Sequence, residues 1–404
     1  GIKGLQFKLL GGLQRGYWSW SKDSYVGGTD LEINMDQYCK ALQERNITWM
    51  LGGSYVLKYE RDEDIVLPGT VYRLALPLTV HALDVRSRFQ LGDYSLLAEY
   101  AWKTQDPSQD NGYIYHRGNA VMLSGSYSKR GLSILAQAKR SDNMAFRSQR
   151  TKQGTSLFIN NMPAFAYQHT YALPALYPYA TQAAGGEWAF QGEVSYLFKR
   201  NTALGGKYGT KVKVNFSHVR GLDKQPVDQY EGSYYGTDGY TSKFFKMGDK
   251  YYQDINVQLE KKFTKSFKLN LMYMNQYYNQ AVIEKHGSSI KSNIAVVEGK
   301  YQFNNKLTLR GEYQYLATKD DEGDWMYGLL ELSVQPHWMF TVSDMWNNGE
   351  TNLHYYMGSV TFNYNAHRLM LGYGRTRAGF NCSGGVCRYV PASRGVQLSY
   401  NFNF

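Results

Sequence analysis

The most constraining feature of this sequence is a strict alternation of apolar and polar residues over long segments. The last ten residues, GVQLSYNFNF, place apolar side chains at every second position, with Gln, Ser or Asn between them. A period of two puts the two kinds of side chain on opposite faces of a β-strand. The pattern is compatible with a soluble antiparallel sheet over a core, and with a membrane barrel whose apolar face meets lipid.

The length of the alternating segments favours the membrane barrel. They run over roughly 10 to 14 residues, whereas strands of soluble proteins usually have about 5 to 6 and a tilted transmembrane strand needs about 9 to 11. No run approaches the roughly 18 apolar residues that a transmembrane helix requires, so a helical membrane protein is excluded. We therefore predict an all-β fold, a transmembrane antiparallel β-barrel that occupies residues 1–404 as one domain.

The barrel is predicted to have about 18 strands, an even number that places both chain ends in the periplasm. Short turns such as QLGDYS, SKRGL and FNNKL alternate with long polar loops, as in barrels with short periplasmic turns and long extracellular loops. The predicted long loops are 104–112, 147–186, 219–250, 280–292 and 378–393. The predicted strands are 2–15, 27–36, 46–61, 72–90, 92–103, 112–129, 131–146, 187–199, 206–218, 251–263, 265–279, 292–303, 306–318, 324–334, 337–346, 353–364, 367–377 and 394–404.

The last strand is predicted to close the barrel by pairing with the first, because a sheet edge in lipid would leave backbone groups unpaired. Its apolar residues, which should face lipid, are Val396, Leu398, Tyr400, Phe402 and Phe404. Its polar residues, which should face inward, are Gln397, Ser399, Asn401 and Asn403. Tyr400, Phe402 and Phe404 are the predicted C-terminal assembly signal. The first residues, GIKGLQFKLLGGLQ, already have the pattern of a strand, so further N-terminal strands and an export leader are expected before residue 1.

The net charge of +11 allows three interpretations. The charge can lie on solvated loops, line a cationic lumen, or contact anionic lipid headgroups such as those of lipopolysaccharide. The candidate lumen charges, on predicted inward faces, are Lys211, Lys213, Lys262 and Arg310. The carboxylates Glu193, Glu260 and Glu312 offset them, which leaves a hydrated, salt-bridged lumen as the alternative. Nucleic-acid binding is not predicted, because no basic helix or recognition motif accompanies the charge.

The motif NCSGGVC contains two of the three cysteines, Cys382 and Cys387. We predict a disulfide between them in an extracellular loop, which fits an oxidising compartment. No metal site is predicted, because no further ligands stand near these cysteines. The histidines are scattered without nucleophile–base spacing, so we predict neither an enzyme nor a cofactor.

The segment 147–186 is the most unusual loop, with three of the nine prolines and a run of aromatic residues. At this length a connection without structure is unusual in a compact domain. It is interpreted as an ordered cap on the extracellular rim, as a constriction folded into the lumen, or as a docking surface for a partner protein. The candidate contact residues of the docking surface are Phe158, Phe165, Tyr167 and Tyr177.

Several stretches from about residue 111 onward carry a resemblance to a known family. They are NGYIYHRGNAVMLSGSYSKRGL, AKRSDNMAFRSQR, QHTYALPALYPYATQ, ALGGKYGTKV and NCSGGVCRYVPASRGVQLSYNF. They resemble an uncharacterised family of outer-membrane β-barrels from Bacteroidota. The resemblance implies a barrel in the outer membrane of a Gram-negative cell, with additional N-terminal strands, and it implies no catalytic residues.

Two functional hypotheses follow from these features. The first is a porin-like channel for small solutes, because most barrels of this kind are channels. The alternative is a barrel subunit or scaffold of a multi-protein outer-membrane assembly or export complex, whose loops or lipid face contact partner proteins of the envelope. Both imply contact with outer-membrane lipid, and the long aromatic loop is the feature that favours the scaffold.

Overall fold

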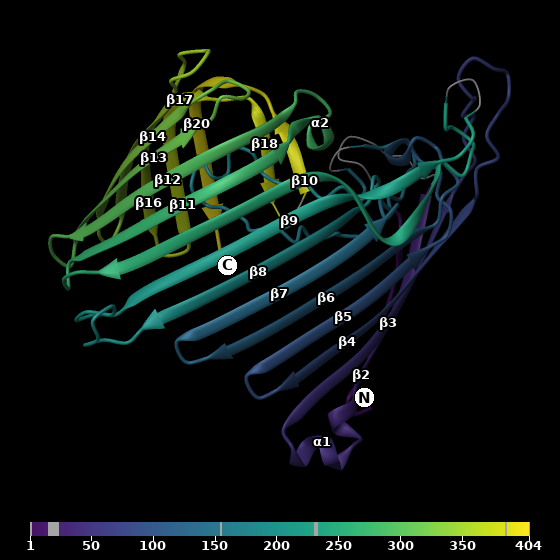
Figure 1. Cartoon of the computed structure of the whole chain (residues 1–404), viewed down its shortest axis with the longest axis horizontal. Helices are drawn as coiled ribbons and strands as arrows, with labels where there is room; N and C mark the ends of the chain where they lie inside the picture. The colour runs from purple at the N-terminus through teal and green to yellow at the C-terminus, as the bar shows by residue number, and fades with distance from the viewer. Residues whose placement is uncertain (1, 15–23, 154–155, 230–232, 384–385, 404) are drawn as a thin grey trace.

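The protein folds into a single curved antiparallel sheet of 18 strands, in which each strand pairs with the next along the chain (Figure 1). The computed structural model describes residues 2–14, 24–153, 156–229, 233–383 and 386–403, and the side chains of residues 380–388 lie outside that description. The strands of the sheet are β1 (Leu5–Gly12), β2 (Ser24–Asn34), β3 (Ile47–Glu60), β4 (Thr79–Leu91), β5 (Tyr94–Lys103), β6 (Gly118–Lys129), β7 (Leu132–Asp142), β8 (Glu187–Phe198), β9 (Thr210–Pro226), β10 (Tyr240–Lys262), β11 (Phe267–Asn279), β12 (Ser289–Gln302), β13 (Leu307–Ala317), β14 (Trp325–Val334), β15 (Trp338–Asn347), β16 (His354–Tyr364), β17 (His367–Thr376) and β20 (Ser393–Phe402).

The remaining elements are short. A separate hairpin, β18 (Gly379–Ser383) and β19 (Val386–Val390), lies between β17 and β20. The helical elements are η1 (Met35–Gln37), α1 (Lys40–Glu44), η2 (Gln109–Asn111) and α2 (Gln280–Ile283). No helix among the described residues is both long and apolar enough to span a membrane.

The predicted number of strands and the sorting of their connections are confirmed. One edge of the sheet carries mostly tight turns, such as 92–93 and 130–131, and the other edge carries the long connections. In the turn 130–131, Gly131 has a φ of 89°, a left-handed conformation that glycine adopts without steric cost. A tight turn of this kind fixes which residues of the two flanking strands pair with each other. A slip of one residue in this pairing would move every side chain of a strand to the opposite face of the sheet.

The predicted loop 219–250 is partly wrong. β9 continues to Pro226 and β10 begins at Tyr240, so the two strands form a hairpin that extends beyond its neighbours. Its pairing is interrupted by register shifts between Ser242 and Tyr252. Such bulges bend a hairpin, and this one arches over the ends of neighbouring strands (Figure 1).

The alternation of the last strand has the predicted orientation. Val396 and Leu398 are each 71% exposed, and Tyr400 and Phe402 are also exposed on the outer face. Gln397 lies on the opposite face, where it lines a pocket inside the sheet. Phe404 lies outside the described residues. The apolar face of β20 is therefore the convex face of the sheet.

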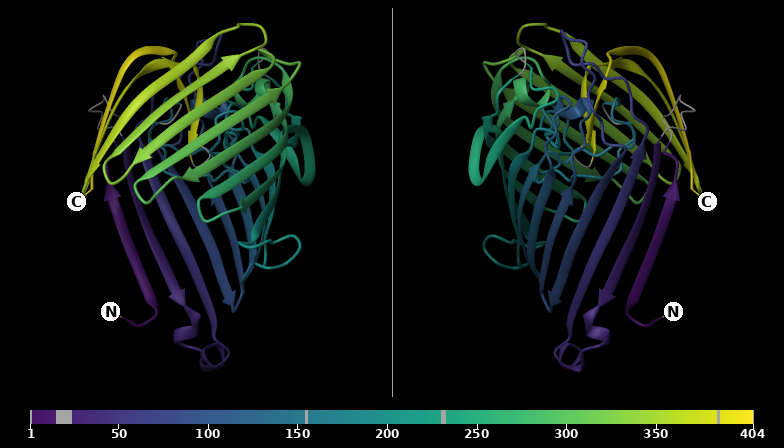
Figure 2. Two further views of the ribbon diagram at one scale, coloured as in Figure 1. Left: turned by 90° about the vertical axis from the view of Figure 1, so that its left-hand side faces the viewer. Right: turned by 90° about the vertical axis from the view of Figure 1, so that its right-hand side faces the viewer.

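The predicted closure of the barrel is wrong for this structure. Each sheet-edge strand has one neighbour, β2 for β1 and β17 for β20, and no described pairing joins β1 to β20. Figure 2 shows the reason: β20 lies on the same side as β1 but is displaced along the axis of the sheet. The stagger accumulated over successive strands therefore leaves the two edges out of register for hydrogen bonding.

Candidate functional site: a loop inside the lumen

The connection between β7 and β8, residues 143–186, lies in the space enclosed by the sheet, which we call the lumen. We name this segment the luminal loop. The views agree that it fills part of the lumen near the edge with the long connections (Figures 1 and 2). Its backbone reaches the wall far from its own strands, because Tyr167 N donates to Ser217 Oγ on β9 (3.0 Å) and Leu173 N donates to Gln314 Oε1 on β13 (2.7 Å). The loop therefore crosses the inner face of the wall from β8 to β13.

Apolar packing holds the luminal loop against this wall. Leu173 is fully buried, Tyr177 is 1% exposed, and both belong to one cluster with side chains of the wall. The buried apolar side chains of the loop in this cluster are Phe165, Ala166, Leu173, Leu176, Tyr177 and Tyr179. Those of the strands are Ala189, Val219, Tyr252, Met272, Met274, Tyr278, Ile290, Ile294, Val296, Leu316 and Trp325. Since burial of one large apolar side chain contributes about 1.5–3 kcal/mol, the cluster makes the docked loop the favoured arrangement.

A buried carboxylate on β10 anchors the middle of the loop. Asp254 is fully buried, and His169 Nε2 lies 3.1 Å from its Oδ2. Asn215 and Tyr252 also donate to Asp254, at 3.0 Å and 2.9 Å. A buried carboxylate requires such donors, because an unsatisfied buried charge is costly. Asp254 thus couples the loop to two neighbouring strands of the wall.

A second anchor joins the two ends of the loop. Lys139 Nζ, at the end of β7, lies 2.6 Å from Glu187 Oε1 at the start of β8, and it donates to the carbonyl oxygen of Pro163 (2.5 Å). The hydroxyl of Tyr179 also donates to Glu187. Burial raises the pKa of Tyr179 well above its usual value, and the negative charge of Glu187 raises it further. Tyr179 therefore remains a neutral donor to this carboxylate.

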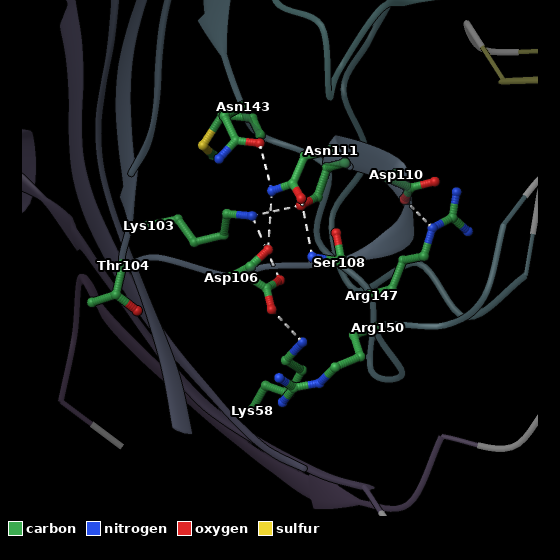
Figure 3. Close-up of polar contacts among 12 residues, drawn as sticks. Lys58, Lys103, Thr104, Asp106, Ser108, Asp110, Asn111, Asn143, Arg147 and Arg150 are labelled. Carbon is green, nitrogen blue, oxygen red and sulfur yellow. Dashed lines mark hydrogen bonds and ion pairs between the residues drawn. The ribbon is translucent and has the colours of Figure 1, made fainter. Parts of the chain in front are cut away.

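A buried ionic cluster fixes the start of the luminal loop, and Figure 3 labels its members Lys58, Lys103, Asp106 and Arg150. We define it as Lys58, Glu60, Lys103, Asp106 and Arg150, none of which is more than 2% exposed. Lys58 Nζ lies 2.7 Å from Asp106 Oδ1, and Arg150 Nε donates to Glu60 Oε2 at 3.1 Å. Burial opposes ionisation of Asp106, but the positive charges of Lys58 and Lys103 outweigh it, so the pKa of Asp106 lies below its usual value. The cluster joins β3, β5 and two loops that are distant in sequence.

The basic residues near the start of the loop are engaged in ion pairs. Arg140 lies 3.1 Å from Asp142, and Arg147 pairs with Asp110. Together with Lys139 and Arg150, they neutralise buried or half-buried carboxylates. Breaking one such pair by removing a partner is strongly destabilising, because the other charge stays buried.

The candidate lumen charges all lie on the inner face of their strands. Lys213 Nζ is 3.3 Å from Glu193 Oε1, and Arg310 lies 3.1 Å from Glu298 and also contacts Glu312. The other two candidates, Lys211 and Lys262, are exposed near the edge with the short turns. Ion pairs of this kind are what a hydrated, salt-bridged lumen would contain. A preference of the lumen for anions stays a prediction.

The candidate contact residues of the loop pack within the chain itself. Phe165 is 6% exposed, and both it and Tyr177 are covered by the inner wall. Tyr167 accepts a hydrogen bond from Gln258 (3.1 Å). Phe158 is half-buried, with the guanidinium of Arg147 3.7 Å from its ring centroid. The structure thus places the segment in the lumen, and a partner protein that contacts it stays a prediction.

The two cysteines of the predicted disulfide lie in β18 and β19. The backbones of these two strands pair so that Cys382 is directly opposite Cys387. The side chains of both residues lie outside the described part of the structure, so the disulfide stays a prediction. Within the described residues, no group of three or more His, Cys, Asp or Glu side chains is arranged to hold a metal ion.

Several hollows lie beside the described part of the luminal loop, and two of them face the inner wall of the sheet. One of about 560 Å³ lies between the loop and the last strands and is lined by Gln168, His169, Arg377 and Gln397 among others. The other, of about 380 Å³, lies between the loop and the inner face of β3 to β6 and includes Arg86 in its lining. The docked loop therefore narrows the lumen and leaves open space on both of its sides.

The apolar inner surface on β11 and β12 was missed by the sequence reasoning. Met272 and Met274 point inward between outward-facing Leu271 and Tyr273, so the sequence LMYM is apolar on both faces. The run IAVV at 294–297 has the same character. A continuous apolar run in an otherwise alternating strand is the signal that the inner face is covered by another segment.

The whole chain, residues 1–404, matches the model of a family of unknown function, DUF6029. No curated protein matches it. Among solved structures, a triple mutant of the porin from Rhodopseudomonas blastica is 10% identical with a TM-score of 0.34, over 89% of this chain and 100% of that one. The siderophore receptor PirA from Acinetobacter baumannii is 12% identical with a TM-score of 0.41, over 93% of this chain and 63% of that one.

Proposed function

The chain belongs to this family of unknown function, and we propose that it is an integral outer-membrane β-barrel protein that acts as a porin-like channel for small solutes. The observation that carries the proposal is the luminal loop, which packs on the inner wall and narrows the lumen without filling it. Sheets of 16 to 18 strands are wide enough to leave an aqueous passage when they close in a membrane. A loop folded against the inside of such a wall sets the width of that passage.

The outer face of the sheet supports the membrane location. Apolar side chains of many strands are exposed there, among them Val85 (59%), Val342 (57%) and Leu398 (71%). At the edge with the short turns, aromatic pairs form on neighbouring positions, such as Trp338 with Phe362 (ring centroids 4.8 Å apart). An apolar band bordered by aromatic side chains is what a lipid-facing barrel surface requires.

The channel is tested by cysteine modification in a planar bilayer. Gln168 is exposed in the 560 Å³ hollow, so a Gln168→Cys protein in a Cys39→Ser background should lose conductance when a charged thiol reagent is added. The matched control is Gln225→Cys, an exposed glutamine on the β9–β10 hairpin. Its modification should leave the current unchanged. A reconstituted protein that carries no current, or a current insensitive to both modifications, would contradict the channel.

The alternative is a barrel subunit or scaffold of a larger outer-membrane assembly, whose partner proteins would contact the loops or the apolar outer face of the sheet. Purification in a gentle detergent followed by mass spectrometry separates the hypotheses, since stoichiometric partners support the scaffold and a bare barrel supports the channel.

The proposed outer-membrane location also implies which lipids contact the protein. The outer face would contact outer-membrane lipid, and the extracellular rim would contact lipopolysaccharide. The assignment to Bacteroidota rests on the sequence resemblance and stays a prediction.

A further inference from the structure

A groove of about 660 Å³ lies on the outer side of the wall, where the β9–β10 hairpin arches over the ends of β5, β6 and β7. We call it the arch groove. The hairpin supplies Tyr240, Ser242 and Phe244, and its tip is held in place because Tyr115 N donates to the carbonyl oxygen of Thr237 (2.8 Å). The arch groove is therefore a formed feature between two parts of the chain.

The base of the arch groove is a saturated polar network. Asp142 accepts hydrogen bonds from Tyr240 (2.6 Å), Ser242 (2.8 Å) and Arg140 (3.1 Å). Arg140 also donates to Asn119 (2.7 Å), and its guanidinium lies 4.8 Å from the ring centroid of Phe244. The ion pair of Asp142 with Arg140 stabilises the arch. Both side chains already hydrogen-bond within the chain, so few of their polar atoms are left to bind a ligand.

Two charged side chains of the lining remain exposed. Arg117 precedes β6, and Asp238 precedes β10. Within the described part of the chain, no carboxylate pairs with Arg117 and no basic side chain pairs with Asp238. A ligand of this groove would therefore meet a free guanidinium, a free carboxylate and the aromatic side chains of Tyr100 and Phe244, which are 47% and 42% exposed.

The arch groove also continues into the apolar outer face. Tyr100 on β5 lies in its lining, and further along the wall Leu96 and Leu123 are 55% and 50% exposed. The polar end of the groove lies toward the long connections, and the apolar wall extends away from them. A molecule with a charged, hydroxyl-rich head and apolar tails matches this order of surfaces, because its head and tails require different surroundings.

We propose that the arch groove binds the phosphorylated sugar headgroup of an outer-leaflet glycolipid. Arg117 donates hydrogen bonds to a phosphate, Asp238 accepts from sugar hydroxyls, and the rings of Tyr100 and Phe244 contact the sugar. The guanidinium fork suits a phosphate geometrically, and such charge-assisted hydrogen bonds are stronger than neutral ones. The acyl chains then lie on the outer face of β5 and β6. This inference rests on the proposed outer-membrane location.

The test measures retention of bisphosphorylated lipid A by native mass spectrometry of the purified full chain in detergent. Arg117→Ala should lower the affinity roughly tenfold, the loss of one charge-assisted contact, and Arg117→Lys should restore part of it. Asp238→Asn should keep or raise the affinity, because it removes a negative charge near the phosphate. Arg130→Ala, on an exposed turn at the opposite edge, is the matched control and should bind like the unmodified protein.

Three results would overturn the inference. They are unchanged binding by Arg117→Ala, equal loss in Arg117→Ala and Arg130→Ala, and equal binding of dephosphorylated lipid A. Each variant is first checked for the heat-modified gel mobility of a folded barrel. The proposed channel function is tested separately, by measuring bilayer current from the same preparation. A protein that conducts but shows no preference for phosphorylated lipid A refutes only the arch-groove inference.

Discussion

Truncation of Leu173 should release the luminal loop from the wall. Its side chain is fully buried in the cluster that joins the loop to β8–β14, while its backbone nitrogen donates to Gln314 on β13. Leu173→Ala removes apolar contacts and leaves a cavity, a change that typically costs 2–5 kcal/mol, about 30-fold to several-thousand-fold in the docking equilibrium. Because the strands are held together by their backbone pairing, the cost should fall on the docked loop rather than on the barrel.

Hydrogen exchange measured by mass spectrometry is the appropriate assay, because it reports local opening. Peptides that cover residues 165–180 should exchange faster in Leu173→Ala, and those of β12 and β13 should remain protected. Single-channel records should show more frequent visits to a higher conductance, as the loop leaves the lumen more often. The heat-modified gel mobility should persist.

Leu204→Ala is the matched control for this experiment. Leu204 lies in the connection between β8 and β9 and is 62% exposed, so its truncation should change stability by less than about 0.5 kcal/mol. Unchanged exchange and conductance in Leu173→Ala would show that the loop is not held by its apolar cluster. Equal effects of both substitutions would point to a general loss of stability instead.

Three further predictions concern charge, orientation and the cysteines. Folding lowers the pKa of Asp106, so its ionised carboxylate stabilises the folded state. This stabilisation is complete above the ordinary pKa of about 4 and is lost as the pH falls through the folded-state pKa. Asp106→Asn should therefore remove part of the acid sensitivity of thermal unfolding and, at neutral pH, destabilise the ionic cluster by roughly 3–5 kcal/mol. Leu398→Arg should cost roughly 2–4 kcal/mol in a bilayer and Ser399→Arg far less, so equal effects on heat-modified gel mobility would refute the orientation of β20. Under non-reducing conditions Cys382 and Cys387 should resist alkylation, and labelling of both without reductant would exclude the disulfide.

The strands and their faces could be predicted because the relevant information is local. In β20, the alternation from Val396 to Phe402 determines which side chains share a face, whatever the strand packs against. The same argument places Arg310 and Glu312 on the inner face of β13, where the structure has them. Strand length relative to the thickness of a bilayer then favours a membrane barrel without any knowledge of tertiary contacts.

The position of the luminal loop could be decided only by the tertiary structure. Its sequence allowed a rim cap, a lumen constriction or a docking surface, because its aromatic residues can be buried in each of them. The deciding contacts join residues far apart in the chain, such as Leu173 and Gln314, which are separated by 141 positions. The closure of the sheet is of the same kind, because it depends on the stagger summed over 18 strands. Local alternation therefore determined the wall of this protein, and long-range packing decided what occupies its interior.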